Sequence, residues 1–197
     1  MSRLALFPDA WVMLAPGSAY PPLTQTAARG GWWLMLRRPL LVACVLGCAM
    51  SLMTSGRVTL RLAVPATIYW SFVPLFEIAA LAAVGTIKRG GFSRTVDLFF
   101  MSHAPWSLGL VGYAAMWAFV PAVHIFTWTT SVWYLPGLAV AAWSGYIDFC
   151  FYRSVIGSSL FQAIRGLLLQ RLICWTGVAA VFLASAGWQV VAARLGL

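Results

Sequence analysis

The chain has few charged side chains. Its 197 residues include four acids, one lysine and two histidines, and charged residues make up 9% of the sequence against 62% hydrophobic residues. A soluble globular domain typically carries about 25% charged residues. The shortage of charge therefore excludes an ordinary soluble domain and indicates an integral membrane protein.

The same scarcity excludes several kinds of site. Four acids do not form the paired carboxylates of a glycoside hydrolase, and no metalloprotease, P-loop or nucleophile-elbow spacing occurs. His103 and His124 are separated by about 30 Å of helix, so they cannot ligate one haem iron. The cysteines have no histidine or further cysteine at metal-ligand spacing and are interpreted as packing residues; they are Cys44, Cys48, Cys150 and Cys174. We expect no cofactor, no bound metal and no catalytic constellation.

What the sequence does have is an excess of arginine. Twelve arginines and Lys88 give a net charge of +9. In a soluble protein this excess would suggest nucleic acid, but here the basic residues flank apolar runs, where they act as topology signals and contact anionic lipid head groups. We therefore expect membrane lipids as partners, with room for a protein partner in the membrane, and no nucleic acid. Arginine-rich, lysine-poor usage is typical of a GC-rich bacterium, which indicates a bacterial cytoplasmic (inner) membrane.

The apolar runs predict one all-α domain, a bundle of five transmembrane helices over residues 32–197. The predicted spans are 39–55, 62–87, 96–120, 125–151 and 172–191. The first would gain length by starting at Trp32, because 17 residues reach only about 25 Å. Residues 1–31 are interrupted by prolines and are predicted to be an irregular tail at the membrane surface, with a binding arm as the alternative. Residues 152–171 are predicted to be a polar, partly amphipathic connector.

The basic residues set the orientation of these five spans. With a cytoplasmic N-terminus, ten basic residues fall on the cytoplasmic side and three, Arg57, Arg61 and Arg194, on the other. Positively charged loops remain on the cytoplasmic side of a membrane. The sequence therefore predicts N-in, C-out.

Glu77 is the main candidate functional residue. It lies inside the apolar run 62–87, where a carboxylate is costly and faces protein or water. Glu77 precedes Lys88 by about 16 Å of helix, and His103 follows Arg94 by about 14 Å, so the two side chains are expected at similar depth. We predict that Glu77 and His103 are neighbours across the second and third spans. The pair is interpreted either as a structural clamp or as a proton-relay or substrate-binding site.

The other carboxylates near spans are predicted to lie at the cytoplasmic interface. Asp97 is close to Arg94 and Asp148 is close to Arg153 in sequence. We expect exposed pairs of this kind, which individually contribute little stability. The predicted charge network comprises Lys88, Arg89, Arg94, Asp97, Asp148 and Arg153.

The order of these features resembles the Yip1-like membrane proteins (Yip1 domain). The similarity rests on the Arg38-Pro39 entry to the first span, a second span with prolines, the loop Gly90-Gly91-Phe92-Ser93 and the mid-membrane His103-Ala104-Pro105. It continues through the glycine-serine stretch in residues 153–171. The resemblance implies five spans with a cytoplasmic N-terminus and a role as a membrane organiser or accessory protein. This chain lacks the long cytoplasmic N-terminal region of members that act with small GTPases.

Two functions from different classes follow. The first is a non-enzymatic protein that organises or assists a membrane protein or lipid assembly. The alternative is a small transporter or permease subunit with a polar site at Glu77 and His103. A wet path to Glu77 would favour transport, and a dry, packed Glu77 would favour the organiser.

Overall fold

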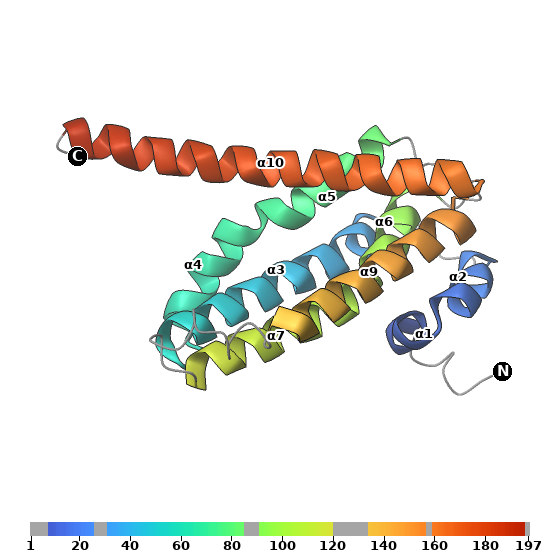
Figure 1. Cartoon of the computed structure of the whole chain (residues 1–197), viewed down its shortest axis with the longest axis horizontal. Helices are drawn as coiled ribbons and strands as arrows, with labels where there is room; N and C mark the ends of the chain where they lie inside the picture. The colour runs from blue at the N-terminus through green and yellow to red at the C-terminus, as the bar shows by residue number, and fades with distance from the viewer. Residues whose placement is uncertain (1–7, 26–30, 85–90, 120–133, 157–158, 196–197) are drawn as a thin grey trace.

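The chain folds as a set of helices. The computed structural model describes residues 8–25, 31–84, 91–119, 134–156 and 159–195, and every regular element in those ranges is an α-helix. The elements are α1 (Pro8–Leu14), α2 (Pro16–Gln25), α3 (Trp32–Ser55), α4 (Leu60–Trp70), α5 (Phe72–Ala83), α6 (Phe92–Phe100), α7 (His103–Phe119), α9 (Tyr134–Ser154) and α10 (Leu160–Leu195). The predicted all-α class is confirmed. In Figure 1, α3, α7 and α9 run alongside one another, and α4 and α5 rise from this layer toward α10.

Three helical stretches in the described part of the chain are long and apolar enough to cross a membrane. They are α3, the α4–α5 pair over Leu60–Ala83, and Leu160–Ser185 within α10, with 24, 24 and 26 residues. A helix of 24 residues is about 36 Å long, which exceeds the roughly 30 Å hydrocarbon core of a bilayer. The first two match predicted spans, and the first starts at Trp32 instead of Pro39. The structure is thus that of a helical protein with the lengths and composition to enter a membrane.

The last helix differs from the prediction. The expected connector 152–171 and fifth span 172–191 are replaced by α9, which runs to Ser154, and a single helix α10 that starts at Leu160. No proline lies between Leu160 and Leu195, so nothing in that stretch removes a backbone hydrogen bond. The arginines of the expected connector are therefore helical residues.

The third and fourth predicted spans correspond to shorter helices. The third, 96–120, is divided between α6 and α7. The fourth, 125–151, is described only from Tyr134 onward, where α9 begins, and 125–133 lie outside the described residues. Neither α7 nor α9 is among the three long apolar stretches, so five spans remain a prediction.

Prolines coincide with both helix breaks that matter for the site. α4 ends at Trp70, four residues before Pro74, and α6 gives way to a turn at Met101, four residues before Pro105. A proline has no N–H for the carbonyl four residues earlier, and its ring crowds that carbonyl. Pro39 and Pro65 lie inside continuous helices, so proline alone does not decide where a helix breaks.

The N-terminal segment is also different from the prediction. The tail predicted to be irregular forms α1 and α2 over most of its length, and Val12, Ala19 and Tyr20 are fully buried. Pro8 and Pro16 are the first residues of these helices, where the missing N–H costs nothing because it would have no helical partner. Pro8 and Pro16, expected to prevent helices, thus begin them, and Pro21 and Pro22 lie inside α2.

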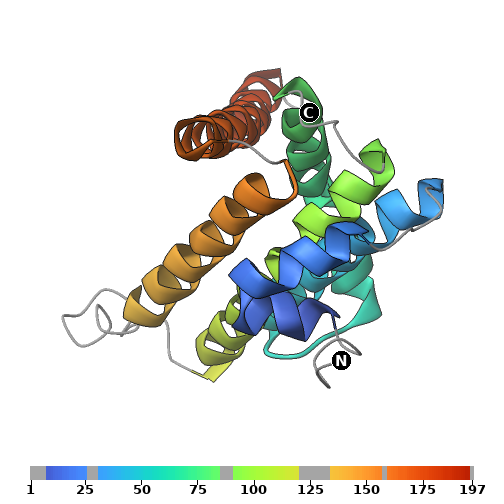
Figure 2. The same ribbon diagram turned by 90° about the vertical axis from the view of Figure 1, so that its right-hand side faces the viewer.

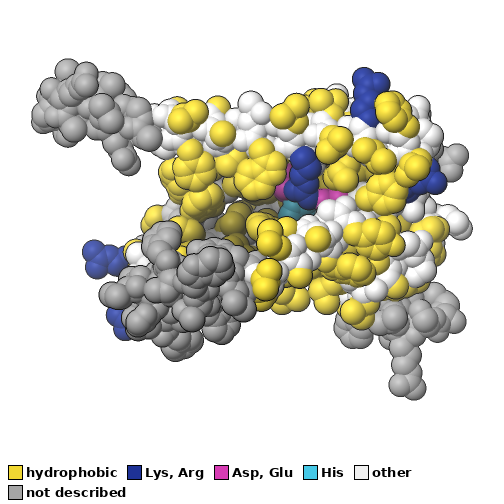
Figure 3. Space-filling view, viewed as in Figure 1, with side chains coloured by type: hydrophobic (Ala, Val, Ile, Leu, Met, Phe, Trp, Pro, Cys, Tyr) yellow, Lys and Arg dark blue, Asp and Glu magenta, His cyan; other side chains and the backbone are white. Residues whose placement is uncertain are grey.

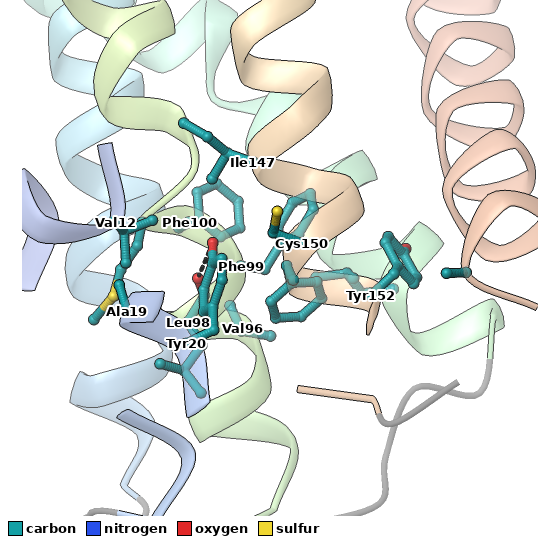
Figure 4. Packing of buried hydrophobic residues seen from close by; sticks show 14 of the residues in the cluster. Val12, Ala19, Tyr20, Val96, Leu98, Phe99, Phe100, Ile147, Cys150 and Tyr152 are labelled. Carbon is teal, nitrogen blue, oxygen red and sulfur yellow. Dashed lines mark hydrogen bonds between the residues drawn. The ribbon is translucent and has the colours of Figure 1, made fainter. Parts of the chain in front are cut away.

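Two kinds of packing hold the helices together. A cluster of aromatic and aliphatic side chains joins α2, α6 and α9, including Tyr20, Phe99 and Phe151 (Figure 4). The α3–α4 pair packs closely instead, since a Cβ at Gly47 would lie 2.6 Å from the carbonyl oxygen of Ala63. Figure 2 shows α9 and α10 on one side of the molecule and α4 to α7 on the other.

The cysteines follow their predicted role in part. All four are free thiols. Cys150 and Cys174 are buried among helices, as expected for packing residues, whereas Cys48 is half-buried and Cys44 is exposed.

Candidate functional site

Glu77 and His103 meet inside the helical assembly. Glu77 Oε2 lies 2.8 Å from His103 Nε2, and each residue is 5% exposed. The predicted neighbour relation is therefore present in the structure. The separation is short enough for a hydrogen bond, but Oε2 has no partner with hydrogen-bond geometry among the described residues. The contact is an ion pair when the imidazole is protonated.

The two proline-associated breaks place this pair. Glu77 lies three residues after Pro74 in α5, and His103 is the first residue of α7, immediately after the turn at Met101–Ser102. Ser102 Oγ lies 3.3 Å from His103 Nδ1, and the Phe100 ring stacks on the imidazole with centroids 4.7 Å apart. Both ring nitrogens and one ring face are thus in contact with protein.

Glu77 lies at the middle of α5, which spans Phe72–Ala83. α5 ends at Ala83, so Glu77 is about 9 Å from that end of the helix, compared with the 16 Å predicted from Lys88. Lys88 itself lies outside the described residues. Glu77 is thus in the middle of α5, and its depth relative to Lys88 stays a prediction.

Two further ionisable residues complete a buried group. Arg171 Nη2 donates to Asp148 Oδ2, and Arg171 Nη1 lies 3.8 Å from Glu77 Oε1. Glu77, His103, Asp148 and Arg171 come from α5, α7, α9 and α10, and we name them the four-helix cluster. Figure 3 shows acidic, basic and histidine side chains together in a hollow beside α10, bordered by hydrophobic side chains.

The prediction for Asp148 is wrong in two respects. Asp148 is fully buried instead of interfacial, and it pairs with Arg171 instead of Arg153. Residues five apart on an α-helix point about 140° away from each other, so the exposed Arg153 does not share the face of Asp148. Asp148 shares its face with the buried residues Ser144 and Tyr152.

Asp97 forms a second ionic group, but not the exposed one that was expected. Asp97 is fully buried, and its Oδ1 accepts from Arg37 Nε (2.9 Å), Arg37 Nη2 (2.8 Å) and Arg38 Nε (2.8 Å). Its Oδ2 accepts from Arg94 Nη1 at 3.1 Å. We name Asp97, Arg37, Arg38 and Arg94 the Asp97 cluster. The predicted Arg94–Asp97 pair is present, while Lys88 and Arg89 lie outside the described residues.

The N-terminal helices are attached to the Asp97 cluster. Asp9 of α1 pairs with Arg38, and Arg94 Nη2 donates to the carbonyl of Leu23 at 2.9 Å. Burial lowers the pKa of Arg94 and Asp97 offsets part of that shift. Burial raises the pKa of Tyr20 in α2, and the charge of Asp148 raises it further. These contacts make α1 and α2 part of the folded structure.

The chemistry available to the four-helix cluster is limited. With a neutral imidazole the cluster has a net charge of −1, and with a protonated one it is neutral. Among the described residues no group of three or more histidine, cysteine or acidic side chains is placed to hold a metal ion. Asp148 Oδ1 and the Gln170 side-chain amide are buried without hydrogen-bond partners in the described structure. The cluster can hold four helices together, and its net charge depends on the protonation of the imidazole.

Sequence reasoning missed Arg171, Arg37, Arg38 and Asp9. Arg171 was assigned to a connector, although a helix starting at Leu160 would place it eleven residues inside an apolar stretch, where a charge requires a partner. Arg37 and Arg38 were interpreted as membrane-surface charges because Asp97, some sixty residues later, gives no local signal of contact.

No protein-family model matches the chain, and neither a curated protein nor a solved structure is significantly similar to it.

Proposed function

We propose that this chain is a non-enzymatic, multi-pass membrane protein that organises or assists a membrane assembly, as its resemblance to Yip1-like proteins implies. The observation that carries the proposal is how the ionisable groups are used. Glu77, His103, Asp148 and Arg171 contact one another across four helices. Groups already engaged in this way fix the helix arrangement, which favours the structural interpretation of the Glu77–His103 pair.

The exposed surface supports a location in the membrane. On α7 and α9, Leu108, Leu135 and Leu138 are each at least 60% exposed, and α10 has Leu168, Leu172 and Leu183 at 63%, 65% and 74%. Large apolar side chains exposed on several helices favour contact with lipid or protein. We propose a bacterial cytoplasmic membrane with the N-terminus inside and the C-terminus outside.

Five spans are the finer part of the proposal. α9 has 21 residues, which is about 31 Å, close to the thickness of the hydrocarbon core. α6 and α7 together cover 92–119 with one short break between them. With either three or five spans, the two termini lie on opposite sides of the membrane. The two topologies differ in the side on which residues 121–124 lie.

A cysteine at position 122 separates these topologies. In a variant whose native cysteines are replaced by alanine, Ala122→Cys should react with a membrane-impermeant maleimide in intact cells if five spans are present. Val58→Cys should react in either topology, and Ser2→Cys in neither. Protection of Ala122→Cys until the cells are opened would contradict five spans, and reaction of Ser2→Cys would contradict N-in.

The organising role predicts a partner on the least covered helix. Only 17% of the apolar window of α10 is buried, compared with 33% for α3. Crosslinking and purification of the tagged full chain from native membranes should recover a partner in fixed ratio. Leu168→Trp with Leu172→Trp should remove it, while Ile68→Trp on α4 serves as a matched control. Equal recovery with all variants would contradict the assignment to α10.

One observation favours transport as a second candidate. Asp148 Oδ1 has no hydrogen-bond donor, and the Arg171 side chain is 29% exposed, so the four-helix cluster retains acceptor capacity beside an accessible cation. A transporter subunit requires that Glu77→Gln abolish proton-coupled uptake in proteoliposomes while the protein stays folded. If Glu77→Gln crosslinked to the partner as the wild type does, and the wild type showed no uptake, the organising role would be supported.

A further inference from the structure

The first half of α3 presents a face that combines aromatic, basic and aliphatic side chains. Trp33, Leu40 and Leu41 are 59%, 49% and 63% exposed, the Arg37 side chain is 42% exposed, and Cys44 is exposed. Residues three or four apart lie on the same side of a helix, as do Trp33 and Arg37, Arg37 and Leu41, and Leu41 and Cys44. We name these five residues the α3 stripe.

The charges next to the stripe do not balance. Arg37, Arg38 and Arg94 face two carboxylates, Asp97 and Asp9, which leaves a net charge of +1. Arg38 and Arg94 are largely covered, with side chains 13% and 11% exposed. Arg37 is therefore the cation that faces outward, and the uncompensated charge is directed to the stripe.

Asp97 also fixes the direction of Arg37. Nε and Nη2 both donate to Asp97 Oδ1, at 2.9 and 2.8 Å, so the guanidinium is held in place at two of its three nitrogens. A cation held by a fully buried carboxylate loses little side-chain freedom when it binds an anion, which lowers the entropic cost of binding. The exposed edge of the Arg37 guanidinium is therefore held in an orientation in which it can donate hydrogen bonds to an anion.

We propose that the α3 stripe binds an anionic phospholipid, with the phosphate on Arg37 and the acyl chains along Leu40, Leu41 and Cys44. Trp33 then lies at head-group level, where indole rings collect in membrane proteins. The net positive charge favours an anionic over a zwitterionic head group. The aliphatic part of the stripe favours a lipid over free phosphate. This inference rests on the proposed membrane location, but not on the number of spans or on a protein partner.

The test measures lipid preference of the purified full chain. Competition between phosphatidylglycerol and phosphatidylcholine is followed by native mass spectrometry or by a spin-labelled lipid, with inorganic phosphate in a separate arm. The wild type should prefer phosphatidylglycerol, and Arg37→Gln should reduce that preference about fivefold, the effect of one basic residue near an anionic surface. Arg57→Gln removes an equal charge at the other end of α3 and should have no effect on the preference.

A second variant is needed because Arg37 also contacts Asp97, so Arg37→Gln could weaken lipid binding by destabilising the fold. Leu41→Gln changes the acyl-chain part of the stripe and leaves the contacts of Asp97 intact, so it should weaken phosphatidylglycerol binding without lowering thermal stability. Equal effects of Arg37→Gln and Arg57→Gln would overturn the proposal, since the preference would then reflect overall charge. Competition by inorganic phosphate would overturn it as well. Lipid preference without a protein partner would leave the lipid site standing and remove the organising role.

Discussion

The two ionic clusters both bury an aspartate, but they satisfy it differently. Asp97 accepts hydrogen bonds from three arginines on both of its oxygens. Asp148 has one cation, Arg171, and its Oδ1 has no donor in the described structure. Both oxygens of Asp97 are therefore satisfied as hydrogen-bond acceptors, whereas Asp148 has one oxygen that is not.

The difference shows what each cluster can do. A buried carboxylate with full hydrogen bonding resists movement, since movement would leave guanidinium groups unpaired. A partly satisfied buried network costs stability and is where water, a proton or a ligand would enter. The Asp97 cluster therefore stabilises the fold and holds Arg37 in place, whereas the four-helix cluster is the one with an unused acceptor for water or a ligand.

The largest effect should come from Asp97→Asn. The variant leaves the mostly covered Arg94 without a counter-charge and Arg38 with Asp9 alone, which is expected to cost about 3–5 kcal/mol of unfolding free energy. Denaturant titration of the purified protein in detergent measures it. Asp9→Asn is the matched control, because that side chain is 47% exposed and its pair should contribute less than about 1 kcal/mol. Equal costs for the two variants would remove the distinction between a buried and a surface carboxylate.

How far the sequence predicts this structure depends on the kind of signal. The Glu77–His103 contact could be predicted because helical rise is nearly constant, so positions relative to flanking charges give depth. The partner of Asp148 could not, because sequence proximity favoured Arg153 while helix geometry turns Arg153 away. The Asp97 cluster depends on a contact between α3 and α6 that no local pattern encodes. The irregular tail was a wrong prediction because Pro8 and Pro16 are the first residues of helices, where a proline is tolerated.

A smaller loss of unfolding free energy is expected for Arg171, because solvent reaches its side chain. Arg171→Gln leaves Asp148 buried without a cation, and because Arg171 is 29% exposed we expect a loss of about 2–3 kcal/mol. Arg153→Gln, at the partner favoured by sequence, should cost less than Arg171→Gln, because Arg153 does not share the helix face of Asp148. A larger loss for Arg153→Gln than for Arg171→Gln would show that Asp148 pairs as the sequence suggested.

The Glu77–His103 contact should give an intermediate coupling. Each of Glu77→Gln and His103→Gln removes the ion pair, so the double variant should be less destabilised than the sum of the two by about 1–2 kcal/mol. Unfolding of all four proteins in one detergent provides the cycle. Strict additivity would mean that the 2.8 Å contact contributes no energy of its own and would weaken the interpretation of the pair as a clamp.

The smallest effect concerns α2, which packs on α9 through Tyr20. Tyr20 donates to the Leu98 carbonyl at 3.5 Å, a long hydrogen bond, and its ring packs on Phe151 with centroids 5.8 Å apart. Tyr20→Phe retains the ring and should cost about 0.5 kcal/mol, whereas Tyr20→Ala also removes a fully buried aromatic side chain and should cost about 3 kcal/mol or more. If Tyr20→Phe were as damaging as Tyr20→Ala, the hydrogen bond to Leu98 and not the ring packing would hold α2 in place.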